Sequence, residues 1–210
     1  MAKYSDLNKL VYPYVTACPD MLIEQALVYS AREFFKQTRL WRKRQMLDVI
    51  PNCNIYPIQA INCGDAYIEE IPHVFRTGEG SATPSELCKV SYREDVPQTG
   101  NQPSHYTAIY PDHLFIGPDP DEKTVFELDL VLVPTVNACS FPDELYESYA
   151  NAIQHGAIAY LKEQTGHPWH DPSGAAHHRQ TFVRLMSEAR IRERRGQVNV
   201  TERVELGGWI

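Results

Sequence analysis

The chain has 210 residues, of which 43% are hydrophobic and 22% are charged, an ordinary composition for a globular protein. Its formal net charge of −7 argues against a general nucleic-acid binder, because duplex binding relies on a broad basic surface. No stretch approaches the roughly 18 apolar residues of a membrane span, and no apolar run follows Met1, so we expect neither a membrane segment nor a secretion signal.

Helical periodicity is concentrated near the two ends of the sequence. Pro19-Asp20 predicts a helix start, because proline suits the first helical turn and aspartate suits its positive end. The apolar face of this helix follows at i, i+4, i+7 and i+11: Ile23, Leu27, Ser30 and Phe34. We expect the helix to end between residues 38 and 41, and we assign residues 1–41 to a helical domain. Residues 32–44, at its exit, contain six basic residues and one acidic residue.

Residues 42–139 have a different pattern, because many prolines cut them into pieces too short for long helices. The clearest strand runs from Phe126 to Leu132, where apolar residues alternate with carboxylates. A Pro- and Asp-rich turn at 117–121 precedes it, which suggests residues 113–116 as the hairpin partner. Weaker strands are expected at 45–50 and 67–71. We interpret this region as a small β-domain inserted between helices.

Helical patterns return after residue 140, and we assign 140–196 to the same helical domain. Ser140 and Asp143 have the spacing of a capping box, in which both side chains satisfy free backbone N–H groups. One face of the first helix contains Leu145, Tyr149, Ala152, Ile153, Gly156 and Tyr160. The second helix is expected from Asp171-Pro172 to about Arg195, with Gly196 as its stop. Its apolar stripe is Ala175, His178, Phe182, Leu185 and Ala189.

The last segment, residues 197–210, is predicted to be an extended C-terminal arm that ends on Trp209 and Ile210. The predicted fold class is therefore α+β: an α-helical bundle formed by the N- and C-terminal segments, with an inserted small antiparallel β-domain and this arm. Such a combination would place both helical segments in one core.

The best candidate for a metal site is a group of four histidines within twelve residues: His167, His170, His177 and His178. Their spacing argues against zinc, because the first two flank a Pro-Trp pair and the adjacent last two point about 100° apart on a helix. The five cysteines include no C-x-x-C pair, which fits reduced thiols. The sequence contains no G-x-S-x-G and no phosphate-binding loop. We predict no catalytic, cofactor or metal site, and a protein that is not an enzyme.

Charge is distributed unevenly along the second half of the chain. Residues 179–195 contain six arginines and two glutamates, whereas residues 119–147 contain eight acidic residues and one lysine. Complementing a helix dipole explains two or three cations, but not four arginines between 190 and 195. Beside the helix-dipole interpretation, the run is compatible with an interface to an acidic partner or to nucleic acid. Opposite patches on one molecule would also suit head-to-tail packing around a ring.

Both ends of the chain contain segments that resemble one protein family. The first half contributes Pro19–Leu27, Ala31–Phe35 and Trp41, and the second half contributes Pro142–Leu145, Tyr149–Ile153, Gly166–Trp169, Phe182 and Arg194–Val198. These segments, and their order along the chain, resemble those of the head-to-tail adaptor (connector, or head-completion) proteins of tailed bacteriophages. The resemblance covers about residues 5–45 and 140–205, whereas the middle matches by position only. His177-His178 and the acidic turn at 119–122 are not part of the pattern.

The resemblance implies a structural virion protein at the head–tail junction, made in the cytoplasm of the bacterial host. Such adaptors form a ring, usually of twelve subunits, that docks on the portal protein and offers an attachment site to a tail or nozzle protein. Genomic DNA passes through the ring without being read, and no membrane is involved. The residues we assign to the portal interface are Arg190, Arg192, Arg194, Arg195, Val198, Val200, Trp209 and Ile210.

Two other classes of function stay open on the sequence. The first alternative is a nucleic-acid-binding module that uses the arginine-rich ends of both helices, which salt-dependent DNA binding would favour. A lysozyme-like or metal-dependent hydrolase of a phage is a third and weaker interpretation, which zinc retained through purification would favour.

Overall fold

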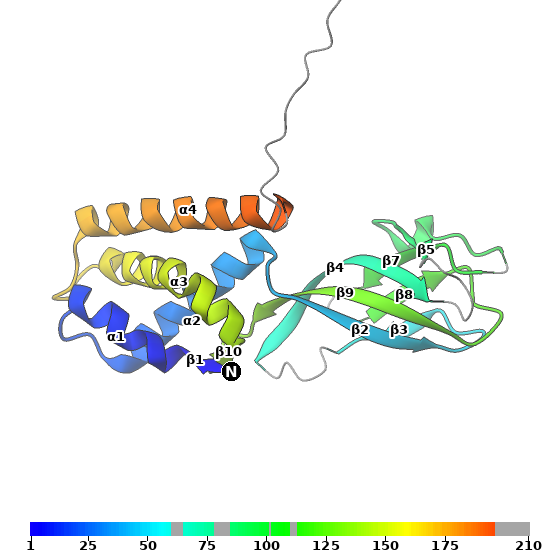
Figure 1. Cartoon of the computed structure of the whole chain (residues 1–210), viewed down its shortest axis with the longest axis horizontal. Helices are drawn as coiled ribbons and strands as arrows, with labels where there is room; N and C mark the ends of the chain where they lie inside the picture. Colours follow the sequence, from blue (N-terminus) through cyan, green and yellow to red (C-terminus); the bar gives the residue numbers. More distant parts are fainter. Residues whose placement is uncertain (60–64, 78–84, 101, 110–112, 196–210) are drawn as a thin grey trace, which may run out of the picture.

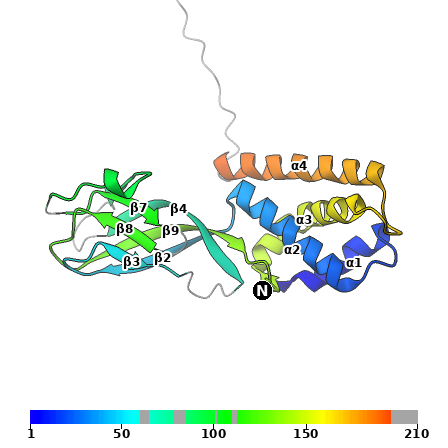
Figure 2. The same cartoon turned by 180° about the vertical axis from the view of Figure 1, so that it is seen from behind.

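The computed structural model describes residues 1–59, 65–77, 85–100, 102–109 and 113–195. The helices gather at one end of an elongated molecule and most of the strands at the other (Figure 1). Figure 2 shows the same arrangement from behind, with α4 lying along one side of the helical part.

Three long helices form the helical part. They are α2 (Asp20–Thr38), α3 (Asp143–Glu163) and α4 (Pro172–Arg195), and a short helix α1 (Asn8–Val11) lies between two 3₁₀ turns, Tyr4–Leu7 and Tyr12–Tyr14. Helix α2 begins after Pro19, as predicted, and ends at Thr38, where Arg39 caps it in the left-handed conformation with a φ of 57°. The predicted apolar stripe of α4 is also confirmed, because Ala175, Phe182 and Ala189 are buried.

The strands form three sheets within the described residues. A two-stranded sheet pairs β1 (Ala2–Lys3) with β10 (Ser140–Phe141). A four-stranded sheet has the order β2-β9-β4-β5, with β2 at Arg42–Val49, β9 at Thr124–Pro134, β4 at Ala66–Thr77 and β5 at Ser85–Glu86. The other four-stranded sheet has the order β3-β8-β7-β6, with β3 at Ile55–Pro57, β8 at His113–Gly117, β7 at His105–Ile109 and β6 at Cys88–Lys89. A short 3₁₀ turn, Arg93–Asp95, follows β6.

The prediction of a small antiparallel β-domain inserted into a helical bundle is wrong. The strands make up two four-stranded sheets, and β6 pairs with β7 in parallel, so the β part is substantial and mixed. Two features hid it. The pairing of β4 with β9 shifts register twice, and most side chains of β4 are half-buried, so no alternation marks this twelve-residue strand. Strands β3, β5 and β6 are only two or three residues long and leave no periodic signal.

Two local predictions are also wrong. Strand β8 exists where expected, but it pairs with β3 and β7 rather than forming a hairpin with β9. Ser140 does not cap α3, because its strand pairing with Lys3 holds it away from the helix. Its backbone N–H and hydroxyl instead donate to the carboxylate of Asp65, at 2.9 and 2.7 Å, and Pro142 precedes the helix.

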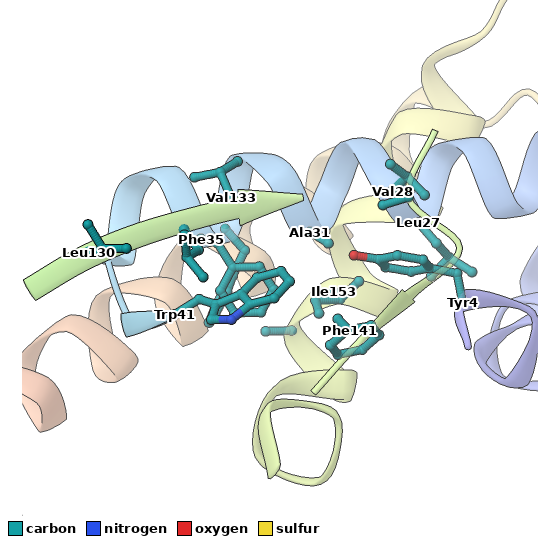
Figure 3. Close-up of a cluster of buried hydrophobic side chains, with 14 of the residues drawn as sticks. Tyr4, Leu27, Val28, Ala31, Phe35, Trp41, Leu130, Val133, Phe141 and Ile153 are labelled. Carbon is teal, nitrogen blue, oxygen red and sulfur yellow. The ribbon is translucent and has the colours of Figure 1, made fainter. Parts of the chain in front are cut away.

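One continuous apolar core joins the helices to the sheets. Figure 3 shows its centre, where Phe35 of α2 lies beside Trp41, with their ring centroids 5.7 Å apart. The Trp41 carbonyl accepts the N–H of Leu132, so the loop after α2 is bonded directly to β9. Strand β9 therefore passes from the β part into the helical part and packs there against α2.

Candidate interface at the C-terminal end of α4

The C-terminal ends of α2 and α4 meet at a polar hollow of about 480 Å³. Arg39 ends α2 in the left-handed conformation, and the chain then enters β2 at Arg42, which lies beneath the last turns of α4. The hollow is lined by Lys36, Gln37, Thr38, Arg39, Arg42, Arg190 and Glu193. Four of these side chains are cationic and one is a carboxylate. The hollow thus gathers the two basic segments that the sequence analysis treated separately, and we name it the cationic hollow.

The cations at the exit of α2 are paired within the chain. The ion pairs are Lys36–Glu69 at 2.9 Å, Arg39–Glu70 at 3.1 Å, Arg42–Asp129 at 3.3 Å and Arg44–Glu127 at 3.1 Å. The bond to Glu69 raises the pKa of Lys36, and the bond from Lys89 lowers the pKa of Glu70. Glu127 and Asp129 of the acidic segment 119–147 are therefore engaged inside the molecule, as is Asp143, which pairs with the terminal amino group at 2.7 Å. This weakens the expectation that the segment meets arginines of a neighbouring copy.

Helix α4 carries both paired and unpaired arginines. Arg179 donates to both carboxylate oxygens of Glu33, at 2.8 and 2.6 Å, and Arg184 pairs with Glu188 at 2.6 Å. Arg190 and Arg192 are exposed, and neither has a carboxylate partner in the part of the chain that the structure describes. Among the α4 side chains that the structure describes, these two arginines are open to an external anion.

The structure places only part of the interface predicted from the sequence. Arg190 and Arg192 lie on the last turns of α4, and Arg194 and Arg195 end the helix, although their side chains fall outside the described part. Val198, Val200, Trp209 and Ile210 lie outside the described residues. Sequence reasoning did not predict that Arg190 would share a hollow with Lys36 and Arg39. The basic run at 32–44 was the available signal.

The histidines are arranged differently from a metal centre. His178 is buried in the α3–α4 interface, and its Nδ1 lies 2.8 Å from Nδ1 of His155, which the sequence analysis did not select. Burial lowers the pKa of His178 to about 4 and lowers that of His155 as well. His167 stacks on Trp169, with centroids 4.5 Å apart. Among the residues with described positions, no three His, Cys, Asp or Glu side chains are grouped to hold a metal ion.

Comparisons with known proteins leave the function to be inferred from the chain itself. In the ranges that the structure describes, no helix has both the length and the apolar character needed to cross a bilayer. No protein-family model matches the chain, and no curated protein sequence matches it significantly.

Proposed function

We propose that this protein is a non-enzymatic subunit of the head-to-tail adaptor ring of a tailed bacteriophage. In this proposal the ring docks on the portal protein, extends the DNA channel, and provides the attachment site for a tail or nozzle protein. The C-terminal end of α4 and residues 197–210 make the contact with the portal. The proposal begins from the resemblance of residues 5–45 and 140–205 to that family.

The observation that carries the proposal is the exposure of Arg190 and Arg192, which have no carboxylate partner among the described residues. They lie within six residues of Gly196, where the predicted arm begins. Charges that are already paired inside a protein contribute little to recognition, whereas unpaired charges at an exposed helix end are available to a complementary surface. An acidic patch on the portal fits this position.

The nucleic-acid alternative is less well supported. It requires both arginine-rich helix ends to face a long polyanion, but most of the cations at the exit of α2 are engaged with internal carboxylates. A basic surface confined to the end of α4 suits a local contact with a protein better than a duplex, which presents charge along its whole length. Genomic DNA would then pass through the ring without sequence-specific contact.

The arm contributes apolar contact in this proposal. Burying Trp209 and Ile210 on a partner stabilises the complex by roughly 3–6 kcal/mol, at about 1.5–3 kcal/mol for each large apolar side chain. Ordering the arm costs about 1–2 kcal/mol for each fixed residue, so backbone pairing must offset much of this cost. The alternation of Val198 and Val200 suits strand addition to a portal sheet, with alternate side chains in pockets.

Truncation after Gly196 tests the proposed function. We expect the truncated protein to keep the melting temperature of the full chain and to lose binding to purified portal, measured by co-sedimentation and electron microscopy. In infected cells, heads would fill but fail to retain DNA. Arg190→Gln combined with Arg192→Gln should weaken portal binding, and Arg184→Gln, which affects a paired arginine of the same helix, is the matched control. Normal head–tail joining by the truncated protein would disprove the role of the arm.

A further inference from the structure

Each of the three nitrogens of the Arg42 guanidinium has an acceptor. Nε donates to the Arg39 carbonyl at 3.3 Å, Nη1 to Asp129 at 3.3 Å, and Nη2 to Glu193 at 2.7 Å. Glu193 comes from α4, whereas the other two acceptors come from elements that precede it in the chain. The carboxylate of Glu193 is thus the link between the end of α4 and the start of β2.

Glu193 differs from the other carboxylates near the cationic hollow. Glu69, Glu70 and Asp129 pair with its cations from outside, and none of them lines it. Glu193 lines the hollow together with Arg190, which has no ion pair within the described chain.

The other three cations of the hollow are balanced within the chain. Lys36, Arg39 and Arg42 pair with Glu69, Glu70 and Asp129, so the Glu193 carboxylate is a second acceptor for Arg42. A carboxylate from outside the chain that bonds to both Arg42 and Arg190 would take the place of this second acceptor.

We propose that Glu193 holds, in the free protein, the place on Arg42 that a carboxylate of an acidic peptide segment takes when a partner binds. The arriving Asp or Glu side chain bonds to Arg42 and Arg190, and Glu193 is displaced toward solvent. A volume of about 480 Å³ is in the range of small-molecule sites and admits one or two side chains, but not a nucleic-acid duplex. Only the identity of the partner as the portal rests on the function proposed above.

Substitution of Glu193 tests this idea, because it predicts tighter rather than weaker binding. The probe is a fluorescein-labelled hexaglutamate peptide, titrated with the full-length protein at low ionic strength and followed by anisotropy. We expect Glu193→Gln to bind the peptide about three- to tenfold more tightly than the native chain, since an internal competitor is removed. Arg190→Gln should weaken binding by a similar factor.

Glu188→Gln is the matched control, because it makes the same change one and a half turns earlier on α4, in a pair with Arg184 that does not line the hollow. It should leave peptide binding unchanged. All variants should melt within about 3 °C of the native protein, since each removes at most one exposed ion pair.

Several results would overturn the proposal. Unchanged or weaker binding by Glu193→Gln would mean that Glu193 only positions Arg42, and an equal gain in Glu188→Gln would mean that net charge alone is measured. Tighter binding of a duplex DNA oligonucleotide than of the peptide, at the same salt concentration, would assign the hollow to nucleic acid. The peptide assay contains no portal, so a positive result with failed portal binding would contradict the adaptor role and leave this site standing.

Discussion

The pair formed by His155 and His178 makes the α3–α4 contact sensitive to acid. The folded state lowers the pKa of both imidazoles, so the unfolded chain binds more protons as the pH falls. The stabilisation is therefore complete above the ordinary histidine pKa of about 6.5 and is lost as the pH falls toward about 4. A charged Lys162 and the neighbouring His177 also disfavour protonation of His178, whereas Asp171 favours it.

We expect the native protein to lose about 1 kcal/mol of its free energy of unfolding through this pair between neutral pH and about pH 4.5. His178→Leu removes one titrating group and should flatten that part of the profile. His167→Leu, at an exposed histidine that does not act on either imidazole of the pair, should leave it unchanged. Urea unfolding across the pH range measures both, and an unaltered profile in His178→Leu would show that another group sets the acid sensitivity.

Gly156 allows a close contact among the three long helices. A Cβ at this position would overlap with the Ser30 hydroxyl and lie 3.0 Å from the Phe182 ring. Ser30 is fixed, because its hydroxyl donates to the Ile153 carbonyl at 2.7 Å. The close approach of α2 and α4 to α3 therefore depends on the absence of a side chain at position 156.

Gly156→Ala should reduce the free energy of unfolding by about 1–3 kcal/mol, because overpacking costs more than the helix propensity that alanine gains. The double variant with Ser30→Ala should recover most of this loss, since it removes the atom that the new methyl group meets. Denaturant unfolding of both single variants and the double variant gives the comparison. If the losses of unfolding free energy in the two single variants simply add in the double variant, the new methyl group is not destabilising through contact with Ser30.

At the scale of whole elements, α4 is held to α2 by a bidentate ion pair between Arg179 and Glu33. The Arg179 guanidinium also lies over the Phe182 ring, 5.5 Å from its centroid. Two parallel bonds and a neighbouring ring restrict the arginine more than a single surface contact does.

A double-mutant cycle with Arg179→Gln and Glu33→Gln should give a coupling energy of about 1 kcal/mol. The pair Arg184–Glu188, on the same helix with a spacing of four residues, should give at most about 0.5 kcal/mol. Thermal or denaturant unfolding of the two cycles provides these values. Equal coupling in both would mean that the bidentate geometry adds nothing.

The three long helices could be predicted from the sequence, because each is strongly periodic and has a proline just before its first residue or at it. Strand β9 was equally clear from its alternation. The other strands could not be predicted in full, because a bulged strand such as β4 loses its period and a two-residue strand such as β5 has none. The cationic hollow could not be predicted either, because Arg190 is far along the sequence from Lys36, Arg39 and Arg42 and meets them only in the folded chain.

At the scale of the whole molecule, the exposed large apolar side chains of the described residues are spread along the chain. Examples are Met21, Met46, Tyr92, Val136 and Ile191. Stable association usually requires an extensive buried apolar area, which such separate side chains do not provide.

We therefore expect the isolated chain to be monomeric or weakly associated, and to form a ring only on the portal. Native mass spectrometry over a range of protein concentrations measures this. A stable dodecamer of the protein alone would show that the subunits have a strong mutual interface that the described surface does not indicate.

The path of β9 has a consequence for how the protein unfolds. This strand lies between β2 and β4 in its sheet, and its far end is bonded to Trp41 and packed on α2. Unfolding of either part would expose apolar side chains of β9 that are buried against the other part. The sheets and the helices should therefore unfold together. We expect one calorimetric transition whose measured enthalpy equals the van't Hoff value. A pull on the sheets would then be passed through β9 to the helices, and the molecule would resist it as one cooperative body.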